Sequence, residues 1–172
     1  MLKAIRGPTL SKDIKIDINY SAIQETIRVH VKEHVLMSQI MFIRIIKKIL
    51  SQPGSGVKYP RSATRSSKRN EAPAAQTGTL RASWGVAGAV TDNGPTIDSN
   101  IWQHGILAPG GGSPIKYGFW LENGTVHMDK RPHVTPAVEE TQNWSDRNLD
   151  VVVQRIVDEL ERRTNFDTGG AE

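Results

Sequence analysis

Five histidines are the side chains best suited to binding a metal: His30, His34, His104, His127 and His133. His30 and His34 are four residues apart and would share a helix face, as zinc-protease ligands do. Glu33 stands directly before His34, however, and no glutamate follows the first histidine, so the catalytic pattern is missing. The chain also has no cysteine to supply a thiolate. We therefore expect solvent-facing or intersubunit histidines and no metal.

Nucleophile and phosphate motifs are missing too. No serine stands in a Gly-x-Ser-x-Gly elbow, and the glycines at 110–112 lack the Lys-Ser/Thr of a phosphate loop. Glu122 is the most interesting single carboxylate. An acceptor for turn amides, or a partner of Arg131, is favoured over a general acid or base. The sequence predicts a protein that is not an enzyme, with no catalytic residue and no cofactor.

Charge is strongly segregated, although the net charge is only +4. No acidic residue lies between Glu33 and Glu71, where eight lysines and arginines occur. From Glu139 onward the sequence contains nine acidic residues and four arginines, which gives this region a net charge of −5. One region can attract the other, within a subunit or between subunits.

Residues 52–76 are rich in Ser, Pro, Gly, Arg and Lys, which predicts a long mobile basic loop. Its candidate contact residues are Lys58, Arg61, Arg65, Lys68 and Arg69. Such a loop could follow DNA phosphates in a sequence-independent, salt-sensitive way. It could instead dock on an acidic protein ring, or simply be solvated.

Periodicity predicts a single α+β domain over residues 1–172, in which a small antiparallel sheet packs against two long helices. We expect a loose arm over residues 1–12, a short strand over 14–18 and a polar tail over 165–172. No apolar run reaches the roughly 18 residues that a bilayer span needs, so we expect a soluble protein with no membrane partner.

The first long helix should cover residues 22–50, with Ser21 and Gln24 as a capping box. A turn at 92–95 should precede a strand over 96–102, and 115–122 fits a helix better than a strand. The final helix should run from 136 to about 163, with Thr135 as N-cap and Pro136 at its first position.

The stretch 117–140 combines an aromatic knot, a glycine turn and a helix start. Tyr117, Phe119, Trp120 and Leu121 form an apolar cluster that we expect to be buried. Gly124 can then take a positive φ and reverse the chain. Further on, Pro132 pushes the residue before it into an extended conformation.

The same stretch resembles the YA-x-x-x-E-x-GT … M-x-x-RP-x-x-x-PA signature of tail-completion proteins, also called head-tail joining or neck proteins, of long-tailed bacteriophages. The matching residues are Tyr117, Glu122, Gly124, Thr125, Met128, Arg131, Pro132, Pro136 and Ala137. Gly118 replaces the usual alanine, and His133 stands where the family usually has phenylalanine. An upstream block, Ala72-Pro73 followed by Thr77, Gly78, Leu80, Arg81 and Ser83, is similar to the family's AP-x-x-TG-x-LR-x-S.

The resemblance covers roughly residues 14–163. It implies a structural virion protein that is assembled in the host cytoplasm and located in the neck. Its subunits would form a homo-oligomeric ring, most often a hexamer, between a head connector (adaptor or stopper) and a tail-terminator or tail-tube protein, around the DNA channel. The alternative, from the basic loop alone, is a nucleic-acid-binding module that acts outside a virion.

Two apolar helix surfaces are candidates for a subunit interface, and they consist of Ile43, Ile46 and Ile49 on the first long helix and Val152, Ile156 and Leu160 on the last. The first is bordered by basic residues and the second by acidic ones. We expect these surfaces to meet, either between subunits or within one.

Overall fold

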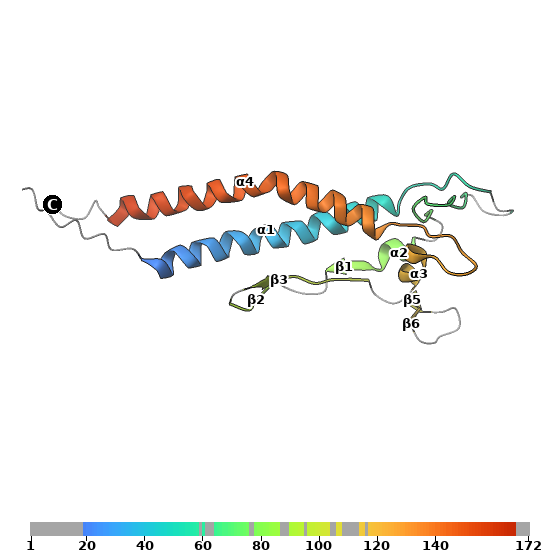
Figure 1. Cartoon of the computed structure of the whole chain (residues 1–172), viewed down its shortest axis with the longest axis horizontal. Helices are drawn as coiled ribbons and strands as arrows, with labels where there is room; N and C mark the ends of the chain where they lie inside the picture. Colours follow the sequence, from blue (N-terminus) through green and yellow to red (C-terminus); the bar gives the residue numbers. More distant parts are fainter. Residues whose placement is uncertain are drawn as a thin grey trace, which may run out of the picture.

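Two long antiparallel helices dominate the computed structural model, which describes residues 19–58, 60, 64–75, 78–86, 90–94, 96–103, 106–107, 114–115 and 117–167. Helix α1 spans Tyr20–Ile49 and helix α4 spans Val134–Asp167. At 1.5 Å per residue they are about 45 and 51 Å long. They lie side by side along the molecule's longest axis (Figure 1). The predicted arm and the strand over 14–18 lie outside the described residues.

Helix α1 begins at a cap that differs from the prediction. The Asn19 side chain accepts a hydrogen bond from the Ala22 amide at 3.1 Å, and the Ser21 hydroxyl donates to the same Asn19 oxygen at 2.8 Å. The predicted capping box of Ser21 and Gln24 is therefore wrong. Asparagine is an equally good N-cap, and here it is the residue that satisfies the free amide.

Within the described residues, short strands form three antiparallel pairs. Helix α2 (Thr79–Ala82) leads into β1 (Trp84–Val86), which pairs with β4 (Ile101–Gln103). The hairpin of β2 (Thr91–Asp92) and β3 (Ile97–Asp98) confirms the predicted turn, and β5 (Ile106–Leu107) pairs with β6 (Pro114–Ile115). The single strand predicted over 96–102 is in fact β3 followed by the start of β4.

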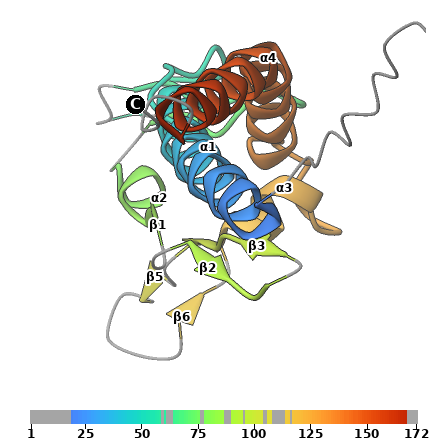
Figure 2. The same cartoon turned by 90° about the vertical axis from the view of Figure 1, so that its left-hand side faces the viewer.

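The strands and α4 lie on opposite sides of α1 when the molecule is viewed along its helices (Figure 2). Strands β1 and β3 contact α1 directly, as does α4 along its length. The predicted α+β class, with a small antiparallel sheet against long helices, is confirmed. Within the described ranges, no helix is apolar and long enough to cross a membrane.

Helix α3 (Tyr117–Asn123) confirms the helical interpretation of this segment. Its Leu121 is buried, but Phe119 is 62% exposed and Trp120 is 46% exposed. The expectation that the whole aromatic cluster is buried is therefore wrong, because a helix of two turns directs only one side toward the core.

The core lies at the end of the helix pair where α1 finishes and α4 begins, and it consists of Phe42, Ile45, Ile46, Leu50, Trp84 and Ala137. Ile46 is completely buried, and Ile43 and Ile49 are partly buried against the same cluster. These three residues thus pack within a single subunit, and Ile46 is not available for a subunit interface.

The antiparallel arrangement also separates the two predicted helix surfaces. The end of α1 packs against Ala137 at the start of α4, whereas Val152 lines a groove with His30 and Met37 near the other end of the pair. The predicted meeting of Ile43, Ile46 and Ile49 with Val152, Ile156 and Leu160 inside one subunit is therefore wrong. Periodicity identifies an apolar face but not which part of another helix covers it.

Candidate functional site

Glu122, at the end of α3, caps the first turn of α4. Its Oε2 accepts hydrogen bonds from the amides of His133 at 2.7 Å and Val134 at 2.8 Å. Its Oε1 accepts from the amide of Thr135 at 2.9 Å and from the Thr135 hydroxyl at 2.7 Å. The first amides of a helix have no partner within the helix, so one carboxylate satisfies three of them at once.

This cap moves the start of α4 relative to the prediction. Helix α4 begins at Val134, with Pro136 as its third residue rather than its first. Thr135 is not the N-cap, because its hydroxyl donates to Glu122 instead of accepting from a later amide. Proline is still tolerated there, since amides of the first turn have no helical acceptor.

The negative charge of the Glu122 carboxylate is stabilised at the start of α4. Burial by itself would raise the pKa of Glu122, but the hydrogen bonds from the amides of His133, Val134 and Thr135 outweigh burial and lower its pKa below the usual value. A negative charge at a helix N-terminus is also favoured by the helix dipole. The predicted role of Glu122 as an acceptor of amides is confirmed, with the amides belonging to α4.

Gly124 reverses the chain between α3 and this cap. Its φ is +77°, and a Cβ atom there would lie 2.9 Å from both the Lys130 nitrogen and the Met128 oxygen. Thr125 and Met128 exchange backbone hydrogen bonds across the turn, and the Arg131 amide donates to the Leu121 carbonyl at 2.7 Å. Glu122, Gly124 and Arg131 therefore fix the orientation of α3 relative to α4. We call residues 121–135 the α3–α4 joint.

Substituting Gly124 should test this turn. We expect Gly124→Ala to lower the free energy of unfolding by about 2 to 4 kcal/mol, since it combines an unfavourable φ with a backbone clash. Gly94 is a matched control, because its φ is +86° and nothing lies within 4 Å of the added Cβ. Urea denaturation of both variants should give a clearly larger loss at Gly124. Equal losses would show that the close approach of residues 128 and 130 has no energetic effect.

His133 fills the position at which the resembling family carries phenylalanine. It is completely buried, and its ring meets Trp84 edge to face at 6.1 Å. The Nδ1 atom lies 3.2 Å from the Arg131 carbonyl oxygen, which requires a proton on Nδ1. Burial lowers the pKa of His133 below its usual value, so the ring is neutral and packs as an aromatic core residue.

The other signature residues surround this joint. Pro132 is half-buried, and Tyr117 opens α3. Arg131 is half-buried, and among the described residues its Nε has no hydrogen-bond partner and its side chain has no ion pair with Glu122. The predicted alternative pairing of Glu122 with Arg131 is therefore wrong. At Gly118 an added Cβ would come within 2.2 Å of the Gln103 Oε1 atom, so this long side chain would have to move.

The upstream block of the resemblance approaches the same joint. Gly78 has a φ of +75° before α2, and Leu80 packs against the core. The Asn70 amide donates to the Lys130 carbonyl at 3.3 Å, and Arg69 lies 3.6 Å from Asp129. Thr77 lies outside the described residues.

The described part of the basic loop is held by hydrogen bonds, although it contains no helix or paired strand. The Glu71 carboxylate accepts from the amide and hydroxyl of Ser55 and from the Lys68 amide. Lys58 and Arg65 form an isolated bridge, and Arg65 and Lys68 are exposed. Arg61 lies outside the described residues. The mobility of the loop stays a prediction.

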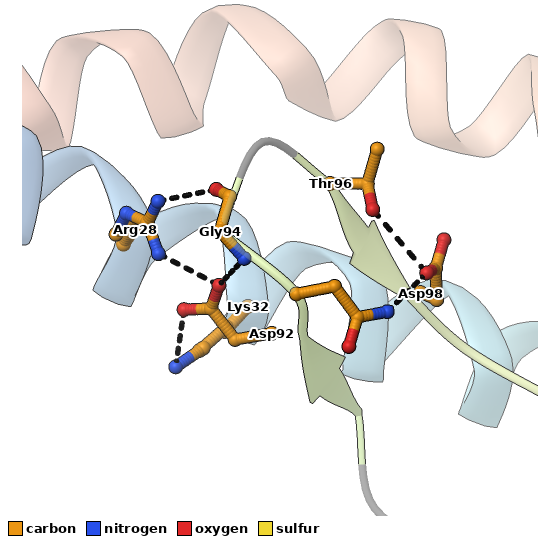
Figure 3. A network of polar contacts seen from close by, with 7 residues as sticks. Arg28, Lys32, Asp92, Gly94, Thr96 and Asp98 are labelled. Atoms are coloured by element: carbon orange, nitrogen blue, oxygen red, sulfur yellow. Dashed lines mark hydrogen bonds and ion pairs between the residues drawn. The ribbon is translucent and has the colours of Figure 1, made fainter.

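Asp92 is a site that the sequence analysis missed. Its Oδ1 accepts from Arg28 at 2.7 Å and from the Gly94 amide at 3.0 Å, and its Oδ2 lies 2.8 Å from Lys32 (Figure 3). Arg28 also donates to the Gly94 carbonyl. The hydrogen bond from Lys32 and that from the Gly94 amide lower the pKa of Asp92 to about 2. These contacts fasten the β2–β3 hairpin to α1.

Removing this charge should loosen the hairpin without unfolding the protein. We expect Asp92→Asn to speed amide hydrogen exchange in β2 and β3, while the cooperative unfolding of the whole protein changes little, because solvent screens ion pairs at the surface. Asp98→Asn is the control, since Asp98 contacts Asn93 and Thr96 within the hairpin. Unchanged exchange in the Asp92 variant would show that the contacts with α1 do not hold the hairpin.

The four histidines within the described ranges do not gather around a common point, and His104 lies outside those ranges. His34 stacks on Trp144 at 5.9 Å and contacts the Ser145 hydroxyl at 2.8 Å, whereas His30 lies near Glu33. In the described ranges, no three histidine or acidic side chains are placed to hold a metal ion.

No protein-family model, curated protein or solved structure matches this chain. Its function is therefore inferred from the joint, the charge distribution and the sequence resemblance.

Proposed function

We propose that this chain is a structural subunit of the neck of a long-tailed bacteriophage, a tail-completion or head-tail joining protein. Its copies would form a ring, by resemblance a hexamer, between the head connector and the tail terminator or tail tube. Assembly would take place in the host cytoplasm. The protein would act by geometry, as a building block that joins two larger rings around the DNA channel.

The observation that carries this proposal is the role of the signature residues in the α3–α4 joint. Glu122 caps α4, Gly124 makes the turn and the Arg131 amide ties the returning chain to α3. These positions form one connected structural unit, although only the sequence resemblance to the family relates them to one another. If related chains share this joint, α3 and α4 would have the same relative orientation in all of them.

The shape and the charges also suit a ring subunit. The helix pair extends well beyond the core, which lies at one of its ends (Figure 1). Lys58, Lys68 and Arg69 are exposed in the basic loop. This loop could reach a neighbouring ring or the DNA channel, where contact with phosphates would be independent of sequence.

The mass in solution tests the proposal against the alternative, a nucleic-acid-binding module outside a virion. Analytical ultracentrifugation at modest salt should give a closed assembly with a mass that is a fixed multiple of 19.0 kDa. A duplex DNA titration in the same buffer is the second measurement. A monomer or dimer that binds duplex DNA tightly would contradict the neck proposal and favour the alternative.

A further inference from the structure

Helix α4 carries an apolar stripe that nothing in the described part of the subunit covers. Leu149 and Val153 are each 51% exposed and Val157 is 39% exposed. The three residues are spaced by four, so they form one line along the helix surface. Asp146 and Asp150 lie beside them and are also exposed. We call these five residues the α4 stripe.

Helix α1 carries a similar line with the opposite charge. Leu36 is 40% exposed and Ile40 is 43% exposed, and Arg44 continues the four-residue spacing. Lys47 follows on the same side of the helix. We call Leu36, Ile40, Arg44 and Lys47 the α1 face.

The charges on both surfaces are left without partners inside the subunit. Among the described residues, Arg44 and Lys47 form no ion pair, and neither do Asp146 and Asp150. Each surface thus combines exposed apolar side chains with unpaired charges of a single sign. Apolar centres with complementary charges at the edge are typical of protein interfaces.

The two surfaces cannot meet within one chain. His34 marks the side of α1 that faces α4, since it contacts Ser145 and stacks on Trp144. At about 100° per residue, Leu36 and Ile40 lie roughly 200° and 240° around the helix from His34, so they are turned away from α4. Because both side chains are exposed, the described strands on the far side of α1 do not cover them either.

We propose that the α1 face of one copy docks on the α4 stripe of the next copy. This inference rests on the proposed ring and names the surfaces that build it. Because the two surfaces differ and lie on different sides of the subunit, the contact is head to tail, and repeating it gives a closed ring or an open filament. Leu36 and Ile40 would pack on Leu149, Val153 and Val157, with Arg44 and Lys47 near Asp146 and Asp150.

A mixing experiment tests this geometry. Ile40→Glu and Val153→Glu each place a carboxylate in the centre of one surface and leave the other surface unchanged. Each variant alone should stay folded by far-UV circular dichroism and sediment as a 19.0 kDa monomer. Mixed at equal concentration, they should form a 1:1 dimer and nothing larger, because each chain keeps one working surface. Val151→Glu is the matched control, since Val151 is 49% exposed on the other side of α4 and this variant should assemble like the wild type.

The outcomes separate this inference from the proposed function. If the wild type forms rings and either variant also does, the docking proposal is overturned while the ring stands. If both variants are monomers and their mixture stays monomeric, the contact is not head to tail and the proposal is also overturned. If the wild type forms filaments that the variants abolish and the mixture gives the dimer, the docking proposal holds and the closed ring does not. A wild type that remains monomeric overturns both.

Discussion

Replacing Ile46 with aspartate is expected to unfold the protein outright. Ile46 is completely buried among Phe42, Ile45, Trp84 and Ala137. An unpaired carboxylate there loses its hydration and the apolar contacts of isoleucine, at a cost of more than about 4 kcal/mol. Domains of this size are stable by only about 5 to 15 kcal/mol. Far-UV circular dichroism and thermal melting should show loss of helix and of the cooperative transition.

Ile40→Asp is the matched control for this prediction. Ile40 lies on the same helix but is 43% exposed, so its variant should keep the helical spectrum and a cooperative melt. A folded Ile46→Asp chain that still assembles would remove Ile46 from the core and overturn the packing described above. Ile46→Val, by contrast, should cost only about 1 kcal/mol.

Replacing Glu122 with glutamine should also destabilise the protein strongly. Glutamine has nearly the same shape, but it keeps one carbonyl oxygen, and its amide group would face the amides that Glu122 now accepts from. Hydrogen bonds to a charged acceptor and the interaction with the helix dipole are lost together. We expect the free energy of unfolding to fall by about 3 kcal/mol, measured by urea denaturation. Glu139→Gln, on the exposed surface of the same helix, is the control and should change stability by less than about 0.5 kcal/mol.

The same joint predicts a loss of stability toward acid. The pKa of Glu122 is lower in the folded chain than its usual 4.5, so its stabilisation is present above pH 4.5 and is lost as the pH falls through the folded value. The pKa of His133 is also lowered, from 6.5, because burial disfavours the charged ring. As the pH falls, His133 is therefore protonated in the unfolded chain before it is protonated in the folded chain. The free energy of unfolding then already declines below about pH 6.5.

Two variants separate these contributions. His133→Phe should remove the decline that begins below about pH 6.5. Glu122→Gln should reduce the one that begins below 4.5 without abolishing it, because the pKa of Asp92 is also lowered in the folded chain. A wild-type stability profile that is flat between pH 7 and about 5 would contradict the His133 assignment, and one that stays flat at lower pH would contradict the Glu122 assignment as well.

Local patterns predicted the elements of the fold well. The apolar spacing of α1 and α4 predicted two long helices, and the Asp-Asn-Gly-Pro run predicted the turn of the β2–β3 hairpin. Gly124 was expected to take a positive φ, and it does. Each of these features depends on residues that are close together in the chain.

Contacts between residues that are far apart in the chain could not be predicted from the sequence. Glu122 caps amides 11 to 13 residues away, and Asp92 binds Arg28 across 64 residues. Ile46 was a candidate for a subunit interface because periodicity shows that a face is apolar but not what covers it. The apolar cluster around Phe119 and Trp120 predicts that both are buried, but both are exposed.

Electron microscopy of the purified wild-type chain is the most direct test of the proposed function. At modest salt and micromolar concentration, the account predicts closed rings of uniform size with an axial opening, built from a fixed number of subunits. The Ile40→Glu variant, imaged in parallel, should show no rings. Images of the wild type that contain only small particles without an opening, from a preparation that is folded by circular dichroism, would contradict the account.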